Sequence, residues 1–310
     1  MVIADHARAL STAQRPLLMI IQSRDTQILR SIFRHRFLTT EHLHALHFVD
    51  RSVRAAQARL KELHDDNYLD RTYVLPPVDG LRRRVRPVYS MARAGAEVLA
   101  AVLGIPPRAI PHTKKATQVG YHHMLHELVV ADLLVSGEAS LGRAPDVRSV
   151  ATLRDHDLRS LLAVARLHQH AATGVVPDGA FIVDAVGLPA PTTIYVEVVH
   201  AGVKGGNARL VEKLERYLQL LRTGFFTSVF NHRRVRALAV VSPSDERVEN
   251  LRVLAERRLR HGRRFVWFAV APRHSARTYP PTTFTVESLA QTEFVDIEGT
   301  RHHLDVNALR

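Results

Sequence analysis

A chain of 310 residues is long for one domain and predicts two, and its 46% hydrophobic content is sufficient for a packed core. The lack of cysteine excludes disulfides and thiolate metal sites, and no apolar run approaches the roughly 20 residues that a membrane-spanning helix needs. Because the amino-terminal residues also lack a signal-peptide pattern, we expect a cytoplasmic protein with no membrane partner.

The positive charge is concentrated in the first third of the chain. The formal net charge is +13, and residues 1–115 hold 19 Lys and Arg against 10 Asp and Glu, a net of +9. An excess of this kind predicts a polyanionic partner. Most of the basic residues are Arg, which contacts phosphate and guanine better than Lys does, although a bias in genomic base composition gives the same excess.

Residues 1–24 form an amino-terminal extension, and residues 25–104 predict a compact unit of three helices followed by two strands. The apolar spacing and the turn residues between the elements carry this prediction. The expected elements are a helix capped by Asp25, a helix within 38–48 capped by Thr39 or Thr40, a helix within 50–69 capped by Asp50 with an apolar stripe that begins at Val53, strands over 69–75 and 85–91, and a closing helix over 92–103.

This order, with the stretches 38-LTTEHLHAL-46, 53-VRAAQARLKEL-63 and 68-YLDRTYV-74, resembles the winged helix-turn-helix family. The resemblance implies that the third helix enters the major groove of double-stranded DNA while the wing contacts phosphates or the minor groove. There are two alternatives: the basic residues of the third helix only keep that helix face in contact with water, or the whole unit binds a protein instead of DNA. The expected DNA-binding residues are Arg51, Ser52, Arg54, Gln57 and Lys61 on the helix and Arg82, Arg83 and Arg84 at the wing tip.

Residues 105–118 are rich in proline, show no periodicity and predict a linker. The remaining residues, 119–310, alternate between helical and strand patterns, which predicts an α/β domain around a central mixed sheet. The fold class expected for the whole chain is therefore α+β or α/β. The expected elements of the second domain are helices over 119–138, 206–223 and 245–261 and strands over 147–153, 175–183, 193–199, 235–241 and 265–271.

Two carboxylates lie in neighbouring strand regions of this second domain. Asp178 belongs to the stretch 175-VVPDG-179, and Glu197 lies within 193-TIYVEVV-199. Many metal-dependent nucleases hold a divalent cation with carboxylates at such positions, because the cation offsets their mutual repulsion. Asp178 and Glu197 are thus the candidate metal ligands.

The order of elements resembles the core of the PD-(D/E)xK, or restriction-endonuclease-like, nuclease superfamily. The resemblance implies that Asp178 and Glu197 bind Mg²⁺ and that Glu127 from the first helix assists them. The Lys that normally follows the glutamate by two residues is replaced by Val199. Lys213 on the next helix is the candidate to substitute for it; the alternative is that Lys213 pairs with glutamates of its own helix or with solvent.

After the winged helix, the chain carries in order His126-Glu127, Pro177-Asp178-Gly179, Glu197-Val198, Glu212-Lys213-Leu214 and Arg216-Tyr217-Leu218. Short motifs in this order are similar to the replication-relaxation family of plasmid and mobile-element proteins. Members commonly continue the third strand as E-x-D-R-G-T, whereas this chain reads 197-EVVHAG-202 and lacks the second acid and the Arg.

The resemblance implies a DNA-binding protein that controls plasmid or mobile-element replication, or transcription. Its nuclease-like domain is expected to be inactive and to serve dimerisation or binding of replication or mobilisation proteins, so we expect a homodimer that needs no cofactor. The alternative is a Mg²⁺-dependent DNA endonuclease or nickase that uses Asp178, Glu197 and Lys213. A second basic cluster, Arg257, Arg258, Arg260, Arg263 and Arg264, either complements a helix dipole or extends the DNA path.

Overall fold

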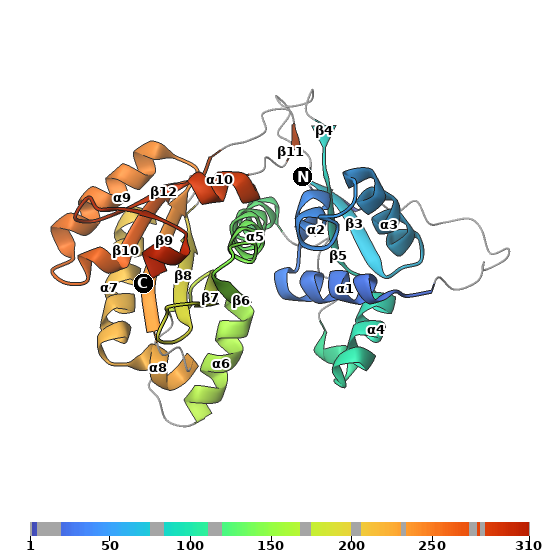
Figure 1. The fold of residues 1–310 in the computed structure, drawn as a ribbon, viewed down its shortest axis with the longest axis horizontal. Helices are drawn as coiled ribbons and strands as arrows, with labels where there is room; N and C mark the ends of the chain where they lie inside the picture. The colour runs from blue at the N-terminus through green and yellow to red at the C-terminus, as the bar shows by residue number, and fades with distance from the viewer. Residues whose placement is uncertain are drawn as a thin grey trace. The chain divides into compact units, whose positions relative to one another are not determined.

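The computed structural model describes residues 2–4, 20–74, 84–110, 120–167, 175–199, 206–230, 234–272, 278–279 and 283–309 (Figure 1). The chain forms two compact units: unit 1 is Met1–Asp132 with His274–Thr282, and unit 2 is Leu133–Arg273 with Thr283–Arg310. The division falls inside helix α5 (Tyr121–Leu141) instead of at the predicted linker over 105–118. One helix therefore contributes its first half to unit 1 and its second half to unit 2.

Unit 1 packs four helices against a small antiparallel sheet with the strand order β1-β3-β5-β2. A further short strand, β4 (Arg84–Val85), pairs in parallel with β11 (Thr278–Tyr279), which comes from the carboxyl-terminal part of the chain. The other elements are α1 (Ser23–His35), α2 (Thr40–His47), α3 (Val53–Asp65), α4 (Arg93–Leu103), the short 3-10 helix η2 (Pro107–Ala109), β1 (Val2–Ala4), β2 (Leu38–Thr39), β3 (Leu69–Val74) and β5 (Pro87–Met91).

Two of the three predicted helix caps are wrong. The N-cap of α1 is Gln22, and Asp25 lies one turn inside the helix, where its carboxylate accepts the backbone N–H of Gln22 at 2.7 Å. The N-cap of α3 is Ser52 instead of Asp50, because the Ser52 hydroxyl accepts the N–H of Ala55 at 3.2 Å. Val53 is consequently the first residue of α3 and is 43% exposed instead of buried. The cap of α2 is Thr39, as predicted.

A buried ion pair joins α1 to α3. Asp25 is fully buried, and both of its oxygens accept hydrogen bonds from the Arg59 guanidinium, from Nε at 2.9 Å and from a terminal nitrogen. The hydrogen bond to Asp25 is the largest cause that raises the pKa of Arg59 above its usual range. Arg59 therefore has a structural role, because its positive charge compensates the Asp25 carboxylate, which is buried away from water.

The first half of α5 belongs to unit 1 through apolar and polar contacts. Met124 and Leu128 pack with Phe37 and the two strand residues Val74 and Val88. His42 of α2 accepts the Thr39 N–H at its Nδ1 (3.2 Å), so its Nε2 carries the proton and donates to the Asp132 carboxylate at 2.5 Å. This buried hydrogen bond ties α2 to the last residue of unit 1 in α5.

Unit 2 is built on a seven-stranded mixed sheet with the order β13-β12-β10-β9-β8-β7-β6. Strands β8, β9 and β10 are parallel, and the remaining neighbours are antiparallel. The strands are β6 (Val147–Arg154), β7 (Gly179–Ala185), β8 (Thr192–Val198), β9 (Arg234–Ser242), β10 (Val266–Val270), β12 (Glu293–Asp296) and β13 (Arg301–His303). The predicted mixture of helices and strands is confirmed.

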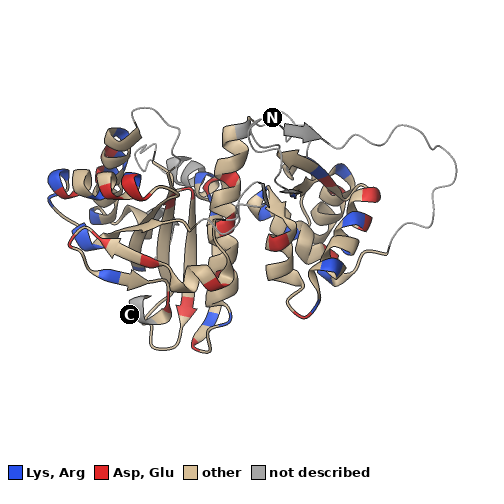
Figure 2. Ribbon diagram, turned by 90° about the horizontal axis from the view of Figure 1, so that it is seen from above, with Lys and Arg blue, Asp and Glu red and all other residues tan. Residues whose placement is uncertain are grey.

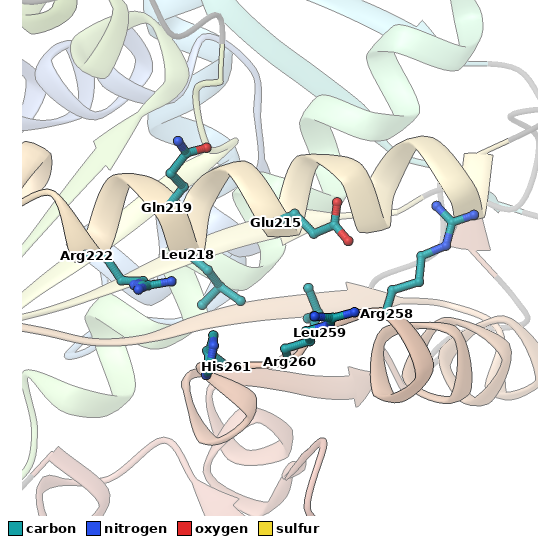
Figure 3. Close-up of a pocket in the computed structure, with 8 residues that line it drawn as sticks. All are labelled: Glu215, Leu218, Gln219, Arg222, Arg258, Leu259, Arg260 and His261. Atoms are coloured by element: carbon teal, nitrogen blue, oxygen red, sulfur yellow. The ribbon is translucent and has the colours of Figure 1, made fainter.

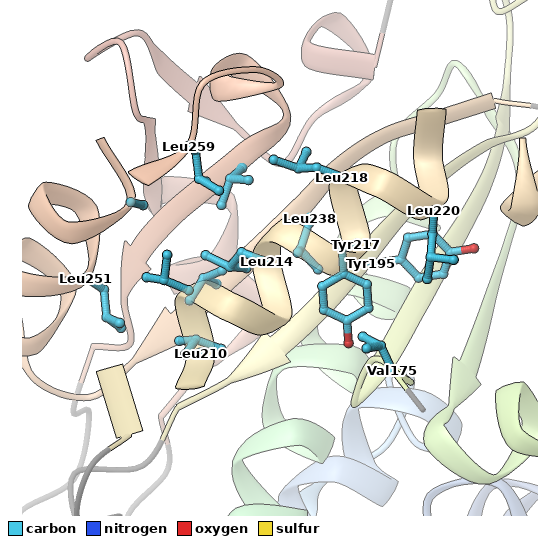
Figure 4. Close-up of a cluster of buried hydrophobic side chains, with 14 of the residues drawn as sticks. Val175, Tyr195, Leu210, Leu214, Tyr217, Leu218, Leu220, Leu238, Leu251 and Leu259 are labelled. Carbon is cyan, nitrogen blue, oxygen red and sulfur yellow. The ribbon is translucent and has the colours of Figure 1, made fainter. Parts of the chain in front are cut away.

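Helices cover both faces of this sheet near β7 and β8. Gly137 of α5 approaches Phe181 on one face, where an added Cβ would lie 2.3 Å from the ring. The other face carries α7 (Gly206–Arg222), which also lines the pocket drawn in Figure 3. Apolar side chains fill the space between this helix, the strands and α9 (Asp245–Arg258), as Figure 4 shows. They include Leu210, Leu214, Tyr217, Tyr195, Leu238 and Leu251.

Several elements of unit 2 were not expected from the sequence. Helix α6 (Asp155–Leu167) begins with two acidic residues, Asp155 and Asp157, which stabilise the first turn of a helix. The others are α8 (Phe225–Phe230), η4 (Arg263–Phe265), α10 (Val286–Gln291), α11 (Val306–Leu309) and the strands β12 and β13.

Charged positions fall mainly on helices and loops, and the central strands carry few (Figure 2). Among the described helices, none is long and apolar enough to cross a membrane.

We expect Arg59→Ala to lower the free energy of unfolding by about 3 kcal/mol, because it leaves the Asp25 carboxylate buried without a counter-charge. Urea denaturation measures the change. Lys61→Ala is the matched control on the same helix, since Lys61 is 68% exposed and pairs with an exposed Asp65, so its loss costs under about 1 kcal/mol. Equal effects of the two substitutions would contradict the structural role of Arg59.

Candidate functional site

Asp178 is held at the start of β7 by the neighbouring strand. Its backbone N–H donates to the Val196 carbonyl at 3.0 Å, and its carbonyl accepts the N–H of Asp155 at 3.2 Å. Its carboxylate oxygen Oδ2 accepts the backbone N–H of Val198 at 2.8 Å. The side chain is therefore turned toward β8, where Glu197 lies.

Glu197 is a charged residue in a strand whose seven residues are all buried. Lys213 of α7 places its Nζ 2.5 Å from Oε1 of Glu197, and the Tyr217 hydroxyl donates to Oε2 at 3.2 Å. Lys213 and Tyr217 are four residues apart, so one face of α7 presents both donors to the same carboxylate. The Lys213 ammonium also lies 5.7 Å from the centroid of the Tyr217 ring.

Burial dominates the electrostatics of this cluster. It raises the pKa of Glu197 to about 7, and the nearby charge of Asp178 acts in the same direction. The charge of Lys213 and the hydrogen bonds from Lys213 and Tyr217 oppose the increase without cancelling it. The pKa of the Tyr217 hydroxyl is raised well above its usual value by burial and by the two carboxylates. Glu197 is thus poised to exchange a proton near neutral pH.

The donor set of this cluster does not fit Mg²⁺, the cation that the nuclease resemblance implies. Both oxygens of Glu197 accept hydrogen bonds from α7, and an oxygen of Asp178 accepts a backbone N–H. Mg²⁺ requires several oxygen ligands in octahedral geometry. Within the described part of the chain, no group of three or more His, Asp or Glu residues could hold a metal ion. The Lys213 ammonium supplies the positive charge beside Glu197 instead.

Of the four acid and base candidates chosen from the sequence, the structure brings three together. Lys213 contacts Glu197 and not the glutamates of its own helix, which was the alternative. Glu127 lies in the half of α5 that belongs to unit 1, where its carboxylate is 3.8 Å from Arg36 and 3.8 Å from His123. The donor role of Tyr217 was missed, although its spacing of four residues from Lys213 was the signal for it.

The predicted DNA-binding residues of α3 lie on an exposed face. Arg51 and Lys61 make exposed ion pairs with Asp50 (3.4 Å) and Asp65 (2.5 Å). Ser52 is the helix cap described above. Arg54 and Gln57 are exposed, and Arg54 has no carboxylate within ion-pair distance among the residues that the structure describes. Of the wing residues, Arg82 and Arg83 fall outside the described residues, and for Arg84 only the backbone, in β4, is described.

We expect the stability of the protein to fall between pH 4.5 and pH 7 because of Glu197. Its folded pKa of about 7 exceeds the ordinary value of 4.5, so the folded protein keeps a proton that the unfolded chain has released. The stabilising contribution is complete below pH 4.5 and is lost as the pH rises toward 7, on the order of 3 kcal/mol.

Urea denaturation at several pH values measures this contribution as the difference between the wild type and Glu197→Gln, which cannot titrate. Glu293→Gln is the control, because Glu293 is exposed in β12 and pairs with Arg301. Parallel curves for wild type and Glu197→Gln would show that Glu197 titrates as an ordinary carboxyl.

Comparison with known families supplies a match over residues 29–235, which include the α3 face and the cluster of Asp178, Glu197 and Lys213. Neither the curated proteins nor the solved structures contain a match to the chain. The family model covers more than half of the sequence, and its description is replication-relaxation. The chain belongs to the replication-relaxation family.

Proposed function

We propose that this protein binds duplex DNA through α3 of unit 1 and thereby controls replication, or transcription, of a plasmid or mobile element. Membership of the replication-relaxation family supports a replication-related role. The order of helices and strands in unit 1 supports its assignment as a winged helix-turn-helix domain, with α3 as the helix that enters the major groove.

The observation that carries this proposal is the two-sided character of α3. Its inner side is fixed by the buried residues Ala56, Leu60 and Leu63 and by the Asp25–Arg59 ion pair. Its outer side presents Arg54 and Gln57, and the small residues Ala55 and Ala58, each next to one of them, are also exposed. Small side chains allow a helix to approach the floor of a groove, while Arg and Gln are suited to phosphate and base contacts. The amino-terminal end of α3 also favours a phosphate.

Unit 2, in this proposal, is a PD-(D/E)xK-type domain that does not cleave DNA. The saturated hydrogen bonding of Glu197 and the ammonium of Lys213 beside it support a structural role for the carboxylate pair. The unit then serves as a platform for a second copy of the chain or for replication or mobilisation proteins. Recognition of symmetric sites by such modules usually requires two copies, so we propose a homodimer.

Arg54→Ala tests the role of α3. We expect it to weaken binding to duplex DNA and to lower the slope of log K against log salt by about 0.9, the amount for one lost phosphate contact. Electrophoretic mobility shifts or fluorescence anisotropy at several salt concentrations measure both quantities. Arg93→Ala is the control, because Arg93 is 78% exposed on α4 of the same unit. Unchanged binding by Arg54→Ala would overturn the assignment of α3.

A metal-dependent endonuclease or nickase is the second candidate function, favoured by the meeting of Asp178, Glu197 and Lys213. We expect no cleavage of supercoiled plasmid by the wild-type protein with Mg²⁺ or Mn²⁺, and the same result for Asp178→Ala. Agarose gel electrophoresis after long incubation provides the readout. Metal-dependent nicking by the wild type that disappears in Asp178→Ala would establish the enzyme in place of the platform.

A further inference from the structure

A basic pocket lies in unit 2, away from the Glu197 cluster. It has a volume of about 350 Å³ and lies between the last turns of α7 and the turn that follows α9 (Figure 3). Its apolar floor is formed by Leu218 and Leu259, which are 7% and 3% exposed. Exposed cationic side chains surround the floor, and they come from both walls: Arg222 from α7, and Arg258 and Arg260 from the end of α9 and the turn.

The three arginines of this pocket have no acidic partner among the described residues, whereas Arg252 and Arg264 nearby are paired. Arg252 pairs with Glu249 at 2.8 Å, and Arg264 pairs with Glu298 at 2.5 Å. Among the described residues, no carboxylate lies within ion-pair distance of Arg222, Arg258 or Arg260. Guanidinium groups bind phosphate oxygens in pairs of charge-assisted hydrogen bonds. Three such groups around one hollow therefore favour an anion, and a phosphate above all.

The wall formed by the turn is held in place by two independent contacts. Gly262 has a φ of +71°, which favours glycine, and an ideal Cβ there would lie 2.5 Å from Cδ2 of Leu218, so the backbone of the turn approaches α7 closely. The Arg263 guanidinium donates to the backbone carbonyls of Leu259 at 3.1 Å and Glu256 at 2.6 Å. The turn that carries Arg260 and His261 is therefore fixed to both helices, as a binding site requires.

The remaining lining residues indicate more than an inorganic anion. Glu215 and Gln219 are exposed on the same wall as Arg222 and offer acceptors for hydrogen-bond donors. A negative Glu215 opposes a ligand that is only an anion, but it suits one that joins a phosphate to hydroxyl or amino groups. The leucine floor suits an apolar ring. A volume of about 350 Å³ is near the lower end for small-molecule sites, which fits one nucleotide and not a duplex.

We propose that this pocket binds a single nucleotide unit, with its phosphate on Arg222 and Arg260 and its sugar or base over Leu218 and Leu259. The unit is either a free nucleoside phosphate or one nucleotide of a single strand, because both present the same chemistry. The proposal goes beyond duplex binding by α3 and does not depend on it.

The test uses the full-length protein and the double variant Arg222→Ala/Arg260→Ala. Isothermal titration calorimetry with nucleoside 5′-monophosphates, and fluorescence anisotropy with short labelled single strands, measure binding. We expect the variant to bind the nucleotide ligand about tenfold more weakly or worse, because charged hydrogen bonds are lost. For a single strand, the slope of log K against log salt should also fall by about 1.4, at about 0.7 for each lost contact.

The control is Arg148→Ala/Arg301→Ala, which removes two exposed arginines of unit 2 whose partners are Asp184 and Glu293. It should bind as the wild type does, and thermal unfolding should show both double variants folded.

Binding of monophosphates assigns a free nucleotide as the ligand, and binding of single strands alone assigns a strand. The proposal is overturned if the wild type binds neither, if Arg222→Ala/Arg260→Ala binds equally well, or if inorganic phosphate alone binds as tightly as the nucleotide. Arg54→Ala should retain this binding, which separates it from the role of α3.

Discussion

A glutamate inside a fully buried strand is the constraint on which unit 2 depends. Removing a carboxylate from water is costly unless hydrogen bonds and an opposite charge compensate for the loss. Lys213 and Tyr217 provide both, and they do so from consecutive turns of one helix. The need to satisfy Glu197 therefore fixes how α7 is rotated against the sheet. The same rotation buries Leu210 and Leu214 in the core and brings Leu218 to the pocket beside the end of α9.

The same cluster shows how the fold accommodates two neighbouring carboxylates. Asp178 and Glu197 remain near each other, and the repulsion between them contributes to the high pKa of Glu197. In a metal site a divalent ion would relieve that repulsion. In this protein the Lys213 ammonium, together with protonation of Glu197 near neutral pH, reduces the repulsion between the two carboxylates. A glutamate in this state favours the stability of the fold at mildly acidic pH.

Local patterns in the sequence predicted most helices of unit 1 and the strands from β6 to β10, because apolar periodicity and turn residues specify such elements. The resemblance to the nuclease superfamily named Lys213 as a candidate to act beside Glu197, with pairing inside its own helix or with solvent as the alternative, and the structure pairs it with Glu197. The cap of α1 was not predictable, since Asp25 is turned inward by Arg59, which is distant in the sequence. The pocket was equally hidden, because it depends on the close approach of Gly262 to Leu218. Contacts of this kind are set by tertiary packing and leave no local pattern.

The pairing of β4 with β11 has a consequence for the order in which the protein is made. Strand β4 is synthesised early, but its partner Thr278–Tyr279 leaves the ribosome only after most of unit 2. Domains usually fold as they emerge, with the amino-terminal one first. Unit 1 therefore keeps an unpaired strand until Thr278–Tyr279 has been made. Strand β4 is thus made before most of unit 2, yet it acquires its strand partner only afterwards.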